Sequence, residues 1–143
     1  GRAGKYDAAE IVLRETVEVD RRVLGPDHID TLYALGNLAH ALCEQGKFSE
    51  AESEFASFED LAVAALPEDN PILVTFQGRH GNCLVRMRRY ERAEPLLLGT
   101  LSKFRASLDD DHQRVQTVIR DIVALYESWG KPGQAARYSA LLK

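Results

Sequence analysis

Gly46-Lys47-Phe48-Ser49-Glu50-Ala51 is the stretch that decides the fold, because the chain repeats its pattern at a fixed interval. Counterparts begin 42 positions apart, and an alanine follows each at the same offset: Gly4-Lys5-Tyr6 with Ala9, Arg88-Arg89-Tyr90 with Ala93, and Gly130-Lys131-Pro132 with Ala135. A second marker keeps the same spacing: Leu24-Gly25-Pro26-Asp27-His28, Leu66-Pro67-Glu68-Asp69-Asn70 and Leu108-Asp109-Asp110-Asp111-His112. Two markers in phase along the whole chain predict stacked supersecondary units.

The segments between the markers carry apolar residues at helical spacing. One face of the third unit collects residues three or four positions apart, namely Ala93, Leu97, Leu101, Phe104 and Leu108. No segment alternates with period two, so no sheet is expected. The pattern therefore predicts an all-α, right-handed α-solenoid of antiparallel helix pairs. Its seven helices should span about 7–23, 29–45, 49–65, 71–87, 91–107, 113–129 and 133–142, with turns near 4–6, 46–48, 88–90 and 130–132.

The two markers also carry the signals that start and stop helices. Gly25 suits the left-handed position after a helix, and Pro26 prevents the helix from continuing. Acidic or amide residues then suit the N-cap of the next helix, namely Asp27, Asn70 and Asp111. Arg88 replaces the turn glycine of the other copies and should cost ~1 kcal/mol if its φ is positive.

These residues carry a family resemblance. The pattern Leu35-x-x-Leu38-Ala39-x-x-Leu42-x-x-x-Gly46-x-Phe48-x-x-Ala51-x-x-x-Phe55 resembles the tetratricopeptide repeat (TPR). The long period and the Leu-Gly-Pro-Asp-His linker resemble the kinesin-light-chain type of that family. The stretch from Leu125 to Ala136 resembles the TPR tails of bacterial serine/threonine protein kinases.

Composition limits the remaining choices. The 143 residues are expected to form a single TPR-like domain, 1–143, within a longer polypeptide, because the repeat pattern begins in mid-unit. A net charge of −4 argues against duplex nucleic acid, and no apolar run is long enough for a membrane span. Cys43 and Cys83 fall at helix-core spacing, which predicts buried free thiols and a cytoplasmic location.

No motif of an enzyme or a cofactor site is present, so neither catalysis nor a cofactor is expected. His80 lies three positions from Cys83, but two ligands do not make a zinc site, and we interpret His80 as a core histidine. His28 and His112 recur because the repeat recurs, so a capping or exposed position is expected for both.

The resemblance implies that the first helix of each pair lines a concave groove. Counted back from the turn marker, the groove residues are Tyr33, Asn37 and His40, then Thr75, Arg79, Asn82 and Arg86, then Thr117 and Arg120. Asn82 falls where the family places an asparagine that holds a ligand's backbone, and an amide can both donate and accept for that purpose. The arginines suit carboxylates, unless Glu44, Asp121 and Glu127 neutralise them within the protein.

Two functions follow as hypotheses. The first is a protein–protein interaction module, a scaffold or adaptor that binds a peptide of a partner, favouring an acidic one. The second is a self-association element that forms homo-oligomers through exposed solenoid ends, within the regulatory C-terminal part of a bacterial kinase. In that case the first helix should expose Leu13 and Val17.

Overall fold

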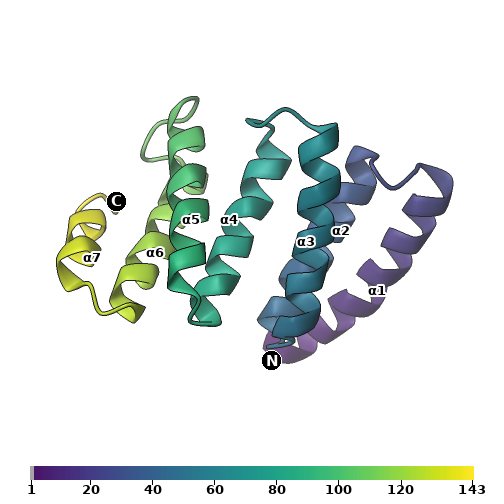
Figure 1. The fold of residues 1–143 in the computed structure, drawn as a ribbon, viewed down its shortest axis with the longest axis horizontal. Helices are drawn as coiled ribbons and strands as arrows, with labels where there is room; N and C mark the ends of the chain where they lie inside the picture. The colour runs from purple at the N-terminus through teal and green to yellow at the C-terminus, as the bar shows by residue number, and fades with distance from the viewer. Residues whose placement is uncertain (1) are drawn as a thin grey trace. The chain divides into compact units, whose positions relative to one another are not determined.

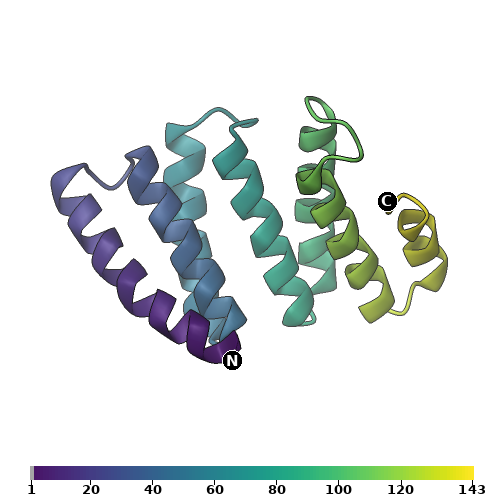
Figure 2. The same cartoon turned by 180° about the vertical axis from the view of Figure 1, so that it is seen from behind.

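The computed structural model describes residues 2–143, with side chains from Gly4 onward, and over this range the chain is helical without any strand. The helices are α1 (Arg2–Val23), α2 (Ile29–Glu44), α3 (Phe48–Ala65), α4 (Pro71–Arg86), α5 (Tyr90–Arg105), α6 (Gln113–Ser128) and α7 (Pro132–Ser139). Consecutive helices within a compact unit run antiparallel, as the ribbon shows from both sides (Figures 1 and 2). The seven predicted helices are confirmed, with most ends within two or three residues of the expected ones.

One predicted turn is wrong. Gly4, Lys5 and Tyr6 lie inside α1, which begins at Arg2 rather than near residue 7. In the other copies the turn reverses the chain after a preceding helix. Gly4 lacks the positive φ of Gly46 and Gly130, so its backbone continues the helix instead of reversing the chain.

The other three turns share one hydrogen-bonding pattern that ends the preceding helix. The amide of Lys47 donates to the carbonyl of Leu42 at 2.9 Å, and the amide of Gly46 donates to that of Cys43 at 2.9 Å. The same pair of bonds closes the turns at 88–89 and 130–131. This Schellman motif needs a left-handed residue, and φ is 79° at Gly46, 75° at Gly130 and 61° at Arg88. Arg88 therefore has a positive φ, which lowers the free energy of unfolding for a residue other than glycine.

The helix N-caps follow the repeat, but not always at the expected residue. Nδ1 of His28 accepts the amide of Asp30 at 3.1 Å, and Nδ1 of His112 accepts that of Arg114 at 3.1 Å. Asn70, midway between them in the repeat, accepts the amide of Ile72 at 2.9 Å through Oδ1. The prediction is confirmed for Asn70 and wrong for Asp27 and Asp111, because the capping position falls one residue later, at histidine.

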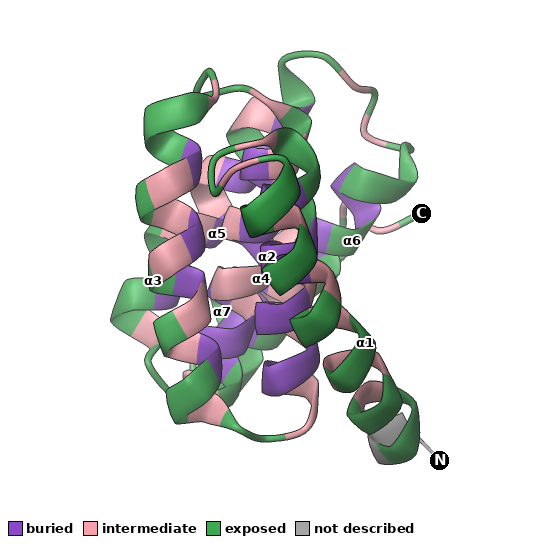
Figure 3. Ribbon diagram, turned by 90° about the vertical axis from the view of Figure 1, so that its right-hand side faces the viewer, coloured by how far each residue is buried: buried purple, intermediate pink, exposed green. Residues whose placement is uncertain are grey.

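The chain divides into two compact units, Gly1–Leu73 and Val74–Lys143. In each unit the purple, buried bands face the neighbouring helices and the green faces point to solvent (Figure 3). The second unit has a continuous core from α4 to α7, centred on residues such as Leu97, Ile119 and Tyr126. The repeated alanines Ala51 and Ala93 are fully buried, as expected of residues where two helices meet closely.

Two predictions about buried positions need correction. Cys43 and Cys83 are buried, but neither is a free thiol, because spacing on a core face does not reveal the oxidation state of sulfur. The prediction of a reducing compartment rested on free thiols and therefore loses its basis. Val17 is buried at 5% exposure rather than exposed, because α2 already covers that side of α1. The exposed apolar side chains of α1 are Ile11, Val12, Val19 and Val23.

A charged cluster fastens α1 to its neighbours. Glu10 accepts hydrogen bonds from Arg14 at 2.8 Å, Lys47 at 2.9 Å and Gln45 at 3.0 Å, and only 13% of its side chain is exposed. The Lys47 bond, followed by those from Arg14 and Gln45, lowers the pKa of Glu10 to about 2. The cluster therefore stays ionised across ordinary pH values.

Replacing Arg88 by glycine should stabilise the protein. Arg88 is exposed and has a φ of 61°, so glycine relieves the backbone strain without removing a buried contact. We expect Arg88→Gly to raise the free energy of unfolding by ~1 kcal/mol, measured by urea denaturation. Gly46→Arg at the matching turn should lower it by a similar amount. A destabilising Arg88→Gly would contradict the strain.

Enlarging Ala93 should destabilise the protein. The residue is fully buried in the core of the second unit, and a leucine there must displace packed neighbours. We expect Ala93→Leu to lower the free energy of unfolding by about 1–3 kcal/mol. Ala136→Leu, at an exposed position of α7, serves as the control in thermal denaturation. Equal melting temperatures for the two variants would mean that the α5 contact is not close.

Candidate functional site

The polar groove residues of the second unit meet around Asp121. Nδ2 of Asn82 on α4 donates to Oδ1 of Asp121 on α6 at 3.0 Å. Two helices that are far apart in sequence are thus joined by a hydrogen bond between partly buried side chains. One donor of the predicted ligand-holding amide is therefore already used within the protein.

The carboxyl group of Asp121 is held in an unfavourable environment. Burial raises its pKa to about 6, against the hydrogen bond from Asn82 and the positive charges of Arg120 and Arg79, which lower it. The sequence expectation that Asp121 would neutralise nearby arginines is therefore met in part. Both guanidinium groups act on the carboxylate through space, but no ion pair within 4 Å joins them in the described residues.

The arginines of the groove differ in exposure. Arg79 is half-buried and its guanidinium lies over the ring of Phe76, 5.5 Å from the centroid. Arg86 and Arg120 are exposed, as is Thr117, whereas Thr75 is half-buried. The second unit thus presents arginine, amide and hydroxyl groups beside one carboxyl group. This chemistry suits the backbone and acidic side chains of a peptide.

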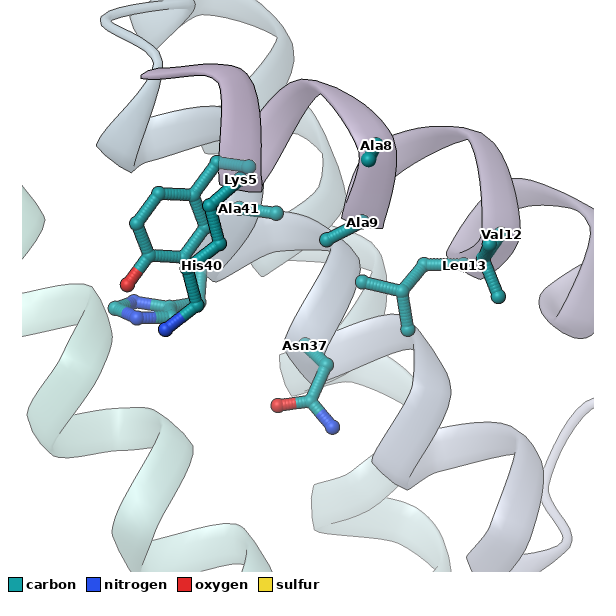
Figure 4. Close-up of a pocket in the computed structure, with 9 residues that line it drawn as sticks. Lys5, Ala8, Ala9, Val12, Leu13, Asn37, His40 and Ala41 are labelled. Atoms are coloured by element: carbon teal, nitrogen blue, oxygen red, sulfur yellow. The ribbon is translucent and has the colours of Figure 1, made fainter. Parts of the chain in front are cut away.

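In the first compact unit, Gly1–Leu73, a pocket of about 520 Å³ opens between α1 and α2. Figure 4 shows Ala9, Val12 and Leu13 of α1 on one side, and Asn37, His40 and Ala41 of α2 on the other. The ring of Tyr6 meets that of His40 edge to face, with centroids 5.8 Å apart. The lining of the pocket is mostly apolar, with polar groups at its edge. Two predicted groove residues, Asn37 and His40, line this pocket, while Tyr33 is exposed and does not.

Sequence reasoning missed the α1 side of this pocket. Lys5 and Tyr6 were assigned to a turn, and Ala8 and Val12 were not considered. The positions 84 residues later, Leu96 and Leu97, belong to the packed face of α5, so the repeat identifies Val12 and Leu13 as residues of an apolar helix face.

No arrangement for catalysis is apparent in the part of the chain that the structure describes. Over this part no group of three or more metal-ligating side chains gathers, and no helix is both long and apolar enough to cross a bilayer. His80, interpreted from the sequence as a core histidine, is half-buried and does not belong to the buried core.

Comparison with known proteins agrees with this geometry. Residues 1–57 match a family model described as tetratricopeptide repeat. Two crystal structures of a Podosopora anserina protein, described as a kinesin light chain with nearly identical TPR-like repeats, share 18% identity with this chain at a TM-score of 0.84. They cover 94% of this chain, which itself spans only 64% of theirs. A search among curated proteins found no match.

These findings confirm the resemblance to TPR proteins of the kinesin-light-chain type. The family model supports it over residues 1–57, and the fold is TPR-like over nearly the whole chain. Such folds generally serve as protein–protein interaction scaffolds and are typically non-catalytic. The resemblance of residues 125–136 to kinase tails stays a prediction.

Replacing Asp121 by asparagine should change how stability depends on pH. The pKa of Asp121 in the folded protein, about 6, lies above the ordinary value of 3.8. The stability that its neutral form contributes is therefore fully present below pH 3.8 and is lost as the pH rises through 6. Asparagine keeps an acceptor for Asn82 without the charge. We expect Asp121→Asn to match the wild type near pH 4 and to exceed it by about 1–2 kcal/mol above pH 7.

The measurement is urea unfolding at several pH values. Asp109→Asn, a change in an exposed loop, controls for the altered net charge. If Asp121→Asn were less stable than the wild type at pH 8, the carboxylate would be stabilised by the arginines more than it is penalised by burial.

Proposed function

We propose that this chain is an adaptor module that binds a peptide segment of a partner protein along the first helices of its pairs. The observation that carries the proposal is the polar cluster of the second unit, where Asn82, Arg79 and Arg120 surround one partly buried carboxyl group. Buried polar groups on a helical repeat surface cost stability and serve no core. A ligand that pairs with these groups would offset part of that cost.

The charge balance favours an acidic ligand. The whole chain carries a net charge of −4, yet this cluster has two guanidinium groups against one carboxyl group whose pKa is about 6. An incoming carboxylate can be held bidentately by an exposed arginine such as Arg120. Binding should weaken with added salt, because exposed charges are screened. Tyr33, Asn37 and His40 of α2 supply the corresponding surface in the first unit.

The proposal includes the cytoplasmic location that the sequence analysis expects. It no longer has the support of free thiols, since neither cysteine is one.

A second candidate function is self-association. It is favoured by the row of exposed apolar side chains on α1, where Ile11, Val12 and Val23 are 60% exposed or more. Exposed apolar patches commonly mark contact surfaces. Light scattering at two protein concentrations separates the two candidates, because only self-association makes the mass depend on concentration.

Removing the side chains of Asn82 and Arg120 from the cluster should weaken peptide binding. We expect Asn82→Ala combined with Arg120→Ala to weaken binding of an acidic peptide by about tenfold or more, measured on a peptide array and then by fluorescence anisotropy. Since Asn82 donates to Asp121, the double variant also loses one internal hydrogen bond. Its melting temperature must therefore be measured beside its affinity.

The control is Arg137→Ala, which removes an exposed arginine from α7 and should bind as the wild type does. Equal peptide binding by wild type and a folded double variant would remove the cluster from the binding surface. It would leave self-association as the better candidate.

A further inference from the structure

The amide of Asn82, which we expect to hold a ligand, is bonded to a carboxyl group of the chain itself. Its Nδ2 donates to Oδ1 of Asp121 at 3.0 Å, which joins α4 to α6. A ligand oxygen that takes this hydrogen must displace Asp121, and one that takes the second hydrogen of the NH2 group must lie beside Asp121. Either way, the acceptor of a ligand meets the carboxyl group of Asp121.

The fold does not require an acid at this position. By the 42-residue repeat, Asp121 corresponds to Arg79 and to Asn37, and all three side chains are half-buried. An amide, a guanidinium and a carboxyl group therefore occupy one repeat position, so helix packing selects none of them. Burial raises the pKa of Asp121 to about 6, although the hydrogen bond from Asn82 and the charge of Arg120 lower it. An acid that packing does not need, and that burial makes hard to ionise, is a candidate for a role in binding.

Few charged groups act on Asp121. Arg79 reaches it from α4 and Arg120 from α6 itself, whereas α5 and α7, which also pack against α6, have no charged group among those acting on it in the described part of the chain. A ligand carboxylate held by these two arginines would lie close to Asp121. Like charges that share a site favour the uptake of a proton by one of them. That proton goes to Asp121, because its carboxyl group is the more buried one.

We propose that Asp121 sets the ligand preference of this cluster: it competes with the ligand for the amide of Asn82, and an acidic segment binds when the carboxyl group of Asp121 carries a proton. The inference rests on the proposed function and deepens it, because it names the residue that couples binding to protonation. A neutral carboxyl group offers its hydroxyl hydrogen to a ligand oxygen instead of repelling it. A ligand without negative charge meets no such repulsion.

The probe is a fluorescent peptide of alternating glutamate and alanine, and the matched probe carries glutamine in place of glutamate. Anisotropy on the full 143-residue chain gives both affinities between about pH 5.5 and about pH 8, where free glutamate stays ionised. We expect the affinity of the glutamate peptide to fall by about tenfold or more over this range, because only molecules with a neutral Asp121 are competent to bind it. The glutamine peptide should show no such loss.

Variants of Asp121 identify the source of the pH dependence. Asp121→Asn keeps an acceptor for Asn82 but cannot ionise, so it should bind the glutamate peptide equally at each pH and about tenfold more tightly than the wild type near pH 8. Asp109→Asn removes the same charge from an exposed loop and should keep the wild-type profile. Histidines titrate in the same range, so a pH dependence that survives in Asp121→Asn would overturn the proposal.

Asp121→Ala distinguishes competition from positioning. It removes the competing acceptor, so a variant with an unchanged circular dichroism spectrum should bind the glutamate peptide more tightly than the wild type near neutral pH. Weaker binding would overturn the proposal, because Asp121 would then hold Asn82 in position for the ligand.

Proton uptake provides a second measurement. Calorimetric titration near neutral pH, in two buffers with different enthalpies of ionisation, should show an uptake approaching about one proton per bound peptide for the wild type and none for Asp121→Asn. No uptake by the wild type would overturn the proposal. A glutamate peptide that binds equally at every pH would overturn this inference and leave the proposed function standing, whereas no binding at any pH would overturn both.

Discussion

The whole structure depends on close approach between the two helices of a pair. At Gly81 the backbone of α4 lies so near α5 that no Cβ fits without displacing Leu97, and Gly78 meets Thr100 in the same way. Ala51 and Ala93 provide small side chains at the repeated contact. Small residues on one helix and branched residues on the other let the apolar surface close without voids. The small residue at this contact recurs every 42 residues, and it fixes the register of the helical segments between successive contacts.

Close approach also brings polar groups together that would otherwise stay in water. Asn82 follows directly after Gly81, so the helix that touches α5 through its glycine must place its amide against Asp121 of α6. The carboxyl group is desolvated by the same packing, and its pKa rises to about 6 despite two nearby arginines. The polar cluster is thus a consequence of the apolar contact. A ligand that replaces lost water around it would recover part of the cost of burial.

Sequence predicted what the repeat encodes. Helix number, the left-handed turns at Gly46 and Gly130 and the cost at Arg88 all follow from the two markers, because each copy confirms the others. Predictions failed where the environment of a copy differs from that of its equivalents. Gly4 lies in a helix because its backbone lacks the positive φ of the turn glycines. His28 caps α2 because local backbone geometry, which composition does not encode, selects the residue after Asp27. The state of the cysteines and the engagement of Asn82 depend on distant partners, which no local pattern reveals.

The same reasoning explains why the two candidate surfaces have different chemistry. In the second compact unit α4 packs against α5 through Gly81 and bonds α6 through Asn82, and half-buried polar groups such as Arg79 lie on that surface. In the first compact unit the pocket between α1 and α2 has a mostly apolar wall, and Val12 is 60% exposed. The two units therefore differ in surface chemistry although the same repeat pattern forms both, because the side chains at equivalent positions differ.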